Sequence, residues 1–191
     1  MKKTILAICL SVSSTAWSAE PIMSSYGKNI YHGYVGIGYD SNIITLKGYS
    51  EGHLPGVSFT FGHNYKPWLD LEFRASTASG YLKAKTGNST DFKYKYNYNL
   101  TGLLKFKWQP VHVLDINLFT GLNYLATEKA LASGSTQNKY DSGLVLGGGL
   151  GFNFTRKFSL NADYLTYQRS SFMGSSNDTW DVANLSFQYH F

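Results

Sequence analysis

The feature that most constrains this chain is an alternation of apolar and polar residues with a period of two. It recurs about eight times along the sequence, and a period of two is typical of a β-strand with one apolar and one polar face. The last segment shows the pattern clearly, with Asp181, Ala183, Leu185, Phe187, Tyr189 and Phe191 against Val182, Asn184, Ser186, Gln188 and His190. The sequence therefore predicts an all-β chain.

The connectors between the predicted strands alternate in length. The strands are expected at 29–40, 55–65, 68–77, 92–106, 111–126, 140–154, 158–168 and 178–191. Short turns are expected at 66–67, 107–110 and 155–157, and longer polar loops at 41–54, 78–91, 127–139 and 170–177. This arrangement predicts an eight-stranded antiparallel up-and-down β-barrel with both chain ends at the end of the short turns. We expect the longer loops to be extracellular.

A soluble barrel of the lipocalin type would show the same alternation, with its apolar face inward. Three features favour a transmembrane barrel. The segments reach the length that a tilted span needs, and the chain ends on an aromatic residue. Aromatic residues also lie near the ends of the apolar faces, as in the girdles of membrane barrels: Tyr31, Tyr39, Trp68, Tyr94, Tyr96, Phe106, Tyr124, Phe154, Tyr164 and Tyr189.

Residues 1–19 have the pattern of a secretory signal peptide. Lys2 and Lys3 precede an apolar run, Thr4–Val12, that is too short to span a bilayer, and small residues follow. We expect export through the Sec pathway and cleavage, with an uncleaved N-terminal anchor as the alternative, and a short periplasmic segment at 20–28. The one cysteine, Cys9, lies in this leader. The mature chain is therefore expected to have no disulfide, no thiolate metal site and no cysteine nucleophile.

With this leader, these strands and this ending, the chain resembles small eight-stranded outer membrane proteins of the OmpA/OmpX type. The resemblance covers nearly all of 29–191 and rests on pattern and length, without a diagnostic motif. It implies the outer membrane of a Gram-negative bacterium and assembly by the barrel-insertion machinery, with Leu185, Phe187, Tyr189 and Phe191 as the assembly signal. It does not fix a function, because the family spans structural proteins, adhesins, serum-resistance factors and a few enzymes.

Charged residues gather on the face predicted to point inward. Because an isolated charge in a narrow interior is costly, opposite charges there should pair. An eight-stranded barrel is only wide enough for its own side chains, so we expect a plugged lumen, with a narrow small-solute pore as the alternative. The predicted lumenal network consists of Asp70, Glu72, Arg74, Lys93, Lys95, Lys105, Asp115 and Asp163. Gly147, Gly148, Gly149 and Gly151 lack the spacing of a dinucleotide loop and should keep this lumen from overfilling.

The histidines give no local catalytic motif. A lipid A deacylase of this fold uses a His and a Ser two residues apart on one strand, and no such pair occurs here. A site assembled across strands, for instance His32 with Ser58 or Asp40, stays open, so a lipid A-modifying enzyme is a further alternative. Pro21 and Gly27 disfavour the amphipathic N-terminal helix of a palmitoyltransferase. We expect no catalytic site, metal or cofactor.

Four lysines near the second long loop carry the main binding hypothesis. Lys83, Lys85, Lys93 and Lys95 either form a solvated rim or bind lipopolysaccharide phosphates or acidic host or matrix polymers. The net charge of +5 falls to about +3 without the leader, which does not indicate nucleic acid binding. The sequence thus favours a monomeric, non-enzymatic surface protein that acts in adhesion, colonisation or envelope protection, and so in virulence.

Overall fold

The computed structural model describes residues 32–45, 52–86, 89–111, 113–131, 136–169 and 179–191. The expected signal peptide, 1–19, and the segment 20–28 lie outside these ranges, as do Tyr31 and the whole of the loop at 170–177. Across the described ranges, no helix is long and apolar enough to cross a membrane.

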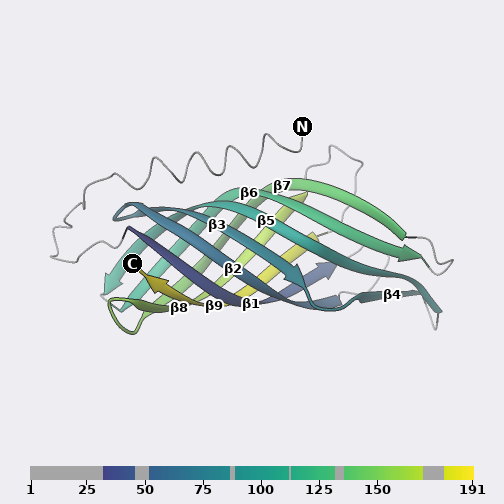
Figure 1. Cartoon of the computed structure of the whole chain (residues 1–191), viewed down its shortest axis with the longest axis horizontal. Helices are drawn as coiled ribbons and strands as arrows, with labels where there is room; N and C mark the ends of the chain where they lie inside the picture. The colour runs from purple at the N-terminus through teal and green to yellow at the C-terminus, as the bar shows by residue number, and fades with distance from the viewer. Residues whose placement is uncertain (1–31, 46–51, 87–88, 112, 132–135, 170–178) are drawn as a thin grey trace.

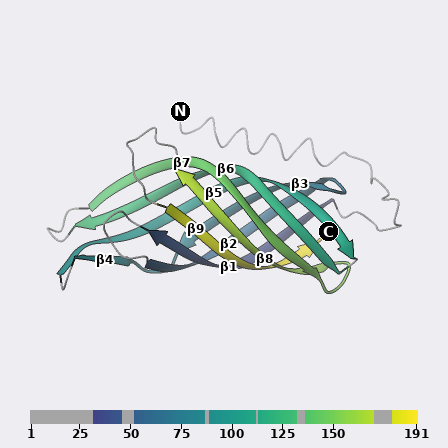
Figure 2. The same cartoon turned by 180° about the vertical axis from the view of Figure 1, so that it is seen from behind.

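The described residues form nine antiparallel strands (Figure 1). They are β1 (Gly33–Thr45), β2 (Gly52–Lys66), β3 (Leu69–Ala78), β4 (Leu82–Thr86), β5 (Ser89–Val111), β6 (Leu114–Leu131), β7 (Thr136–Asn153), β8 (Phe158–Arg169) and β9 (Thr179–His190). Because β3 and β4 both pair with β5, they share one position in the sheet. The pairing of β1 with β9 completes a ring of eight positions, which the view from behind also shows (Figure 2). The predicted eight-stranded antiparallel barrel is confirmed.

The apolar face of the barrel points outward. Along β2, Val57 and Phe59 are exposed while Ser58 and Thr60 are buried. The same order holds on β1 and β6, where Ile37 and Leu118 are largely exposed. Only a lipid environment favours an apolar outer surface of this extent, and the closed ring pairs the backbone groups that lipid cannot hydrogen-bond.

Several strands run further than their apolar pattern predicted. β1 continues to Thr45, inside the expected loop 41–54, and β5, β6 and β7 reach 23, 18 and 18 residues. Beyond the membrane a strand needs no apolar outer face, so its backbone ladder continues without the alternation that identifies it. Figure 1 shows β4 and the adjoining ends of β5, β6 and β7 projecting past the other strands.

A β-bulge in β5 reverses which side chains face inward. The register with β6 shifts between Tyr96 and Tyr98, so Asn97 is an extra residue on β5. Tyr98 is exposed, but Tyr96 is 1% exposed and lies inside the barrel. The prediction that Tyr96 belongs to the outer girdle is wrong, because the alternation was extended through the bulge.

Candidate functional site

A charged cluster fills the half of the interior nearer the short turns. Arg74 donates through Nε to Glu72 Oε1 at 2.5 Å and through Nη2 to Asp163 Oδ2 at 2.6 Å. Tyr34 Oη donates to Glu72 Oε2 at 2.5 Å, and Lys105 Nζ lies 3.9 Å from the same oxygen. All five residues are buried. Because β3 and β8 lie across the ring from each other, the Arg74–Asp163 ion pair bridges the interior.

Two further predicted members lie closer to the end of the short turns. Asp70 Oδ1 is 2.7 Å from Lys107 Nζ, which also donates to Asn64 Oδ1 at 3.1 Å. Asp115 accepts a hydrogen bond from Asn153 Nδ2 at 2.9 Å instead of pairing with a cation. Lys107 was missed because the sequence assigned it to the turn 107–110, although it continues the inward alternation of β5.

Lys93 and Lys95 do not belong to this interior cluster. Lys93 is exposed, and Lys95 is half-buried with its Nζ 5.2 Å from the centroid of the Tyr81 ring. Assigning them to the lumenal network was wrong, because the bulge at Asn97 turns the preceding residues of β5 to the opposite face.

The other half of the interior holds most of the buried apolar side chains, together with polar ones such as Asn42 and Asn99, and this was not predicted from the sequence. We call this cluster the apolar cap. Trp180 stacks on Tyr167 at 4.7 Å between ring centroids and contacts Tyr96 at 5.3 Å. Asn42 accepts from Trp180 Nε1 at 3.2 Å and donates to Tyr96 Oη at 3.1 Å, so the polar atoms of both rings are bonded. The cap consists of Ile44, Leu54, Tyr96, Leu103, Phe119, Leu125, Val145, Leu165, Tyr167, Trp180 and Val182.

Lumenal glycines make room for the larger interior side chains. A Cβ at Gly62 would lie 2.0 Å from Tyr34 Cζ, and one at Gly149 would lie 2.1 Å from Asp163 Oδ1. Any side chain at these positions would displace a member of the charged cluster. The glycines therefore serve packing, in line with the expectation for Gly147, Gly149 and Gly151. The expectation was wrong for Gly148, which lies on the outer wall beside Ala162 and Ala183.

The cross-strand catalytic site suggested for His32 does not form. Ser58 Oγ and Asn184 Nδ2 both donate to Asp40 Oδ1, at 3.1 and 2.5 Å, while His32 is exposed at the end of the short turns. This corrects the suggestion that His32 could act with Ser58 or Asp40.

The structure instead brings Ser159 and His190 together. Ser159 Oγ lies 2.9 Å from His190 Nε2 and accepts from Asn161 Nδ2 at 3.2 Å. Ser159 is only 2% exposed and points into the filled interior. A lipid substrate outside the barrel cannot reach this hydroxyl, so the contact is structural. The two residues are 31 positions apart, and no local motif marks them.

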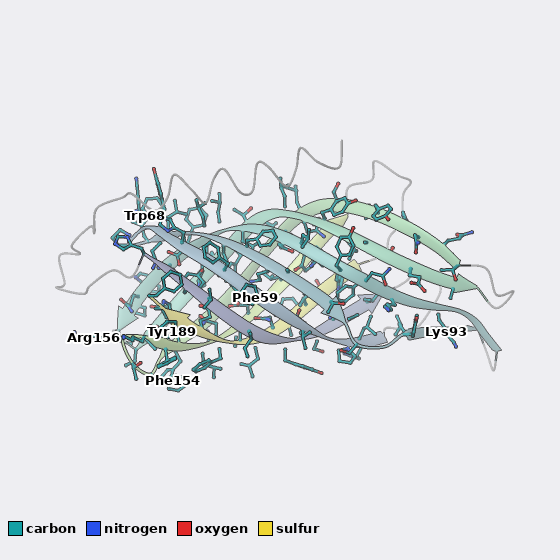
Figure 3. All side chains as sticks on the ribbon, in the orientation of Figure 1. Phe59, Trp68, Lys93, Phe154, Arg156 and Tyr189 are labelled. Atoms are coloured by element: carbon teal, nitrogen blue, oxygen red, sulfur yellow. The ribbon has the colours of Figure 1, made fainter. Side chains whose placement is uncertain are left out.

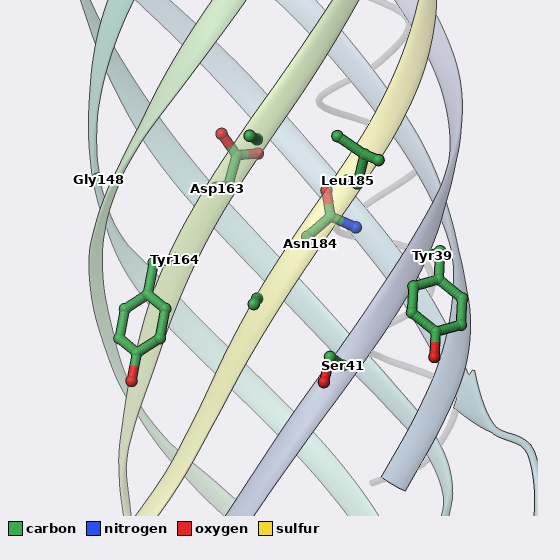
Figure 4. Close-up of a pocket in the computed structure, with 9 residues that line it drawn as sticks. Tyr39, Ser41, Gly148, Asp163, Tyr164, Asn184 and Leu185 are labelled. Carbon is green, nitrogen blue, oxygen red and sulfur yellow. The ribbon is translucent and has the colours of Figure 1, made fainter. Parts of the chain in front are cut away.

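The outer wall carries one shallow depression, shown in Figure 4, among the pockets of the described residues. Small residues of neighbouring strands, Gly148, Ala162 and Ala183, leave a space of about 410 Å³ between the rings of Tyr39 and Tyr164. The remaining lining residues are Ser41, Asp163, Asn184 and Leu185. Asp163 and Asn184 direct their polar atoms to interior hydrogen bonds and away from this space. Within the described ranges no group of three or more His, Cys, Asp or Glu residues could hold a metal ion.

The hairpin of β4 and β5 brings lysines together at the projecting end. Lys83 is the register partner of Lys93, and Lys95 is the partner of Glu128 on β6. Like charges directly opposite each other destabilise a strand pair unless a counter-charge is present. Figure 3 shows Lys93 at the end of the barrel away from the labelled aromatic residues. Lys85 is the register partner of Thr90 on the same hairpin.

Aromatic rings border the apolar surface at both ends. At the end of the short turns, Trp68 stacks on Phe106 at 6.2 Å, and Figure 3 shows Phe154 and Tyr189 at the same end. Towards the projecting end, the ring of Tyr124 lies 6.4 Å from that of Tyr98 and 6.1 Å from that of Tyr140. Two aromatic girdles around an apolar belt, on a closed barrel with a filled interior, define a small transmembrane β-barrel protein.

The comparisons with known proteins agree with this class. Residues 4–191 match the family described as outer membrane protein beta-barrel domain. The chain belongs to this family, whose members lie in the bacterial outer membrane. A comparison with the curated proteins finds no match.

Three solved structures illustrate the likeness of fold. Ail, the attachment invasion locus protein of Yersinia pestis, is 15% identical with a TM-score of 0.62, and the alignment covers 85% of this chain and all of Ail. Neisserial surface protein A is 16% identical with a TM-score of 0.64, covering 84% of this chain and 97% of the other. OprG from Pseudomonas aeruginosa is 16% identical with a TM-score of 0.56, covering 84% and 96%. Ail has also been solved in complex with the heparin analogue sucrose octasulfate.

Proposed function

We propose that this outer membrane barrel is a non-enzymatic surface-contact protein whose projecting end faces outward and binds acidic polymers. The observation that carries the proposal is the pairing of Lys83 with Lys93 in register on a hairpin that extends past the barrel. Like charges so placed repel each other, and a counter-charge relieves the repulsion. A sulfated or phosphorylated polymer supplies one, and each contact near an anionic surface contributes about 1 kcal/mol per lysine.

The filled interior supports surface contact over conduction. The Arg74–Asp163 bridge crosses one half of the lumen and the apolar cap fills the other. Both groups of side chains occupy the space that a solute would have to cross. A pore therefore requires rearrangement of both layers, whereas contact through the projecting strands requires none.

A solved structure of the same fold has a ligand of this chemical kind. Ail is solved with a heparin analogue, which is a sulfated sugar. At 17% identity the likeness extends to fold alone, so the lysine positions of this chain carry the inference. Adhesion to host or matrix polymers and contact with lipopolysaccharide phosphates are the two roles that such a site serves in an envelope.

The test measures binding of the refolded protein to immobilised heparin, with unsulfated dextran as the reference surface. We expect binding that weakens as salt rises and that falls in the variant Lys83→Gln with Lys93→Gln. A separate variant, Lys85→Gln, tests the remaining lysine of the hairpin. The matched control removes two cations at the opposite end, Arg156→Gln with Lys157→Gln, and should bind as the wild type does. Unchanged binding in the folded Lys83/Lys93 variant would contradict the proposal and would mean that these lysines are only solvated by water.

A further inference from the structure

The end of the barrel with the short turns carries uncompensated positive charge. Lys66 at the end of β2, and Arg156 and Lys157 between β7 and β8, are exposed. Across the described ranges none of these three residues forms an ion pair. We call Lys66, Arg156 and Lys157 the basic collar.

Acidic side chains at this end are already engaged. Asp70 is buried against Lys107 at 2.7 Å, and Asp115 accepts a hydrogen bond from Asn153 at 2.9 Å. Both therefore leave the collar without a neutralising partner among the described residues. The projecting end differs, because Lys139 pairs with Asp141 at 3.8 Å there.

The collar lies at the same depth as the aromatic girdle. Lys66 Nζ is 5.4 Å from the centroid of the Trp68 ring and 5.9 Å from that of Tyr65, and both rings are about half exposed. Figure 3 shows Arg156 beside Phe154 at the same end. Exposed aromatic rings mark the level of lipid headgroups at a membrane interface. The ammonium and guanidinium groups therefore stand at headgroup depth.

The turns that carry the collar are too short to reach past the headgroups. β2 and β3 are joined by Pro67 and Trp68, and β7 and β8 by Phe154–Lys157, which is fastened by Thr155 Oγ1 accepting from the amides of Lys157 and Phe158 at 3.2 and 3.1 Å. A partner in the periplasm would have to approach the bilayer surface itself. A phosphate of the adjoining leaflet already lies there.

We propose that the basic collar binds anionic phospholipid headgroups of the leaflet at the end of the short turns. With the projecting end outward, as in the proposed function, this is the periplasmic leaflet. The collar thereby selects phosphatidylglycerol-type lipid over zwitterionic lipid around this end of the barrel. Lys66 receives a phosphate from its open side while its other side rests on the two rings.

Two natural reporters allow a direct test. Trp68 and Trp108 are exposed at this end, whereas Trp180 is buried in the apolar cap and shielded from lipid. Replacing Trp17 by Phe leaves Trp68, Trp108 and Trp180 as the tryptophans of the chain. This protein is refolded into phosphatidylcholine vesicles that contain either brominated phosphatidylglycerol or brominated phosphatidylcholine. Bromine quenches tryptophan fluorescence on contact. The ratio of the two quenching efficiencies therefore measures which lipid occupies the collar, whichever way the barrel is inserted.

We expect phosphatidylglycerol to be preferred about fivefold at a site that contacts one cation, and the preference to disappear in about 1 M salt. The variant Lys66→Gln, Arg156→Gln and Lys157→Gln should quench equally with both lipids. The matched control Lys93→Gln, Lys95→Gln and Lys139→Gln removes the same charge at the other end and should keep the preference. Folding of every variant is checked by the shift of the unheated protein in gel electrophoresis.

Equal quenching of the wild type by both lipids would overturn the proposal without any variant. An equal loss in the matched control would overturn it as well, because the selection would then follow total charge. Binding of acidic cell-wall peptide by the collar, with no lipid preference, would assign the surface to the cell wall instead. None of these outcomes depends on heparin binding at the projecting end, so the two proposals fail separately.

Discussion

Replacing Arg74 by Ala should destabilise the barrel strongly, because two buried carboxylates share this one guanidinium. Arg74 is 2.5 Å from Glu72 and 2.6 Å from Asp163, and both acidic side chains are fully buried. After the substitution, Glu72 keeps Tyr34 and a distant Lys105 at 3.9 Å, whereas Asp163 loses its ion pair with Arg74. Removing one partner of a buried ion pair costs about 3–5 kcal/mol. We expect a loss of that size in the free energy of unfolding.

Urea unfolding of the refolded protein in lipid vesicles, followed by tryptophan fluorescence, measures this loss. The matched control is Lys139→Ala, which breaks an ion pair at 3.8 Å whose lysine is 51% exposed. That pair should contribute only about 0–1 kcal/mol. A second variant, Arg74→Met with Asp163→Asn, removes both charges of that ion pair together and leaves Glu72 with Lys105. It should recover most of the stability if stranded charge is the cause.

The reasoning fails if Arg74→Ala leaves the unfolding midpoint where Lys139→Ala leaves it. Such a result would mean that water solvates the carboxylates in the folded barrel. The interior would then be hydrated, and a conducting barrel would again be the better hypothesis.

Four further outcomes follow from the filled interior and the orientation. In planar bilayers the wild type should show no steady single-channel current, and well-defined channels would contradict the filled lumen. Gly149→Val places a Cβ within 2.1 Å of Asp163 Oδ1 and should lower the urea midpoint, at a cost of about 1–3 kcal/mol. Trp180→Ala empties the centre of the apolar cap and should cost about 3–5 kcal/mol by the same assay. In whole cells a membrane-impermeant thiol reagent should label Asn138→Cys and not Arg156→Cys; the reverse pattern would invert the proposed orientation.

The strand pattern was predictable because lipid imposes one rule on every strand. Each outward position must be apolar within the membrane, so residues such as Phe59 and Leu118 carry the signal independently of their partners. The rule ends where the membrane ends. The apolar pattern therefore did not predict that β1 continues to Thr45 or that β5 reaches its full length.

The interior was harder to predict, because its contacts join strands far apart in the chain. The sequence predicted that opposite charges on the inward face would pair, without naming the partners, and Asp70 and Lys105 are register partners. The ion pair nevertheless runs diagonally to Lys107. Arg74 meets Asp163 across 89 positions, which depends on the closure of the ring and cannot be read from either strand.

The sequence does contain an indication of the apolar cap, namely apolar residues at inward positions, where the alternation predicts polar ones. Val182 stands on the polar face of the last strand, and Leu165 and Tyr167 occupy the inward positions of β8. Their concentration towards one end of the barrel shows that the inward face changes character along its length. A bulge such as that at Asn97 leaves no comparable mark, because its position depends on the register with β6.

The bridge between Arg74 and Asp163 also constrains how the chain enters a membrane. The two residues come from opposite walls, so the bond exists only after β1 has joined β9. In an open, half-inserted sheet the same side chains would face lipid or the insertion machinery as unpaired charges, at a cost of several kcal/mol. Insertion strand by strand into bare lipid is therefore disfavoured. We expect the sheet to curl, pair its charges and cross the bilayer in one concerted event. Alternatively, an insertion catalyst keeps the inward face hydrated until β1 pairs with β9.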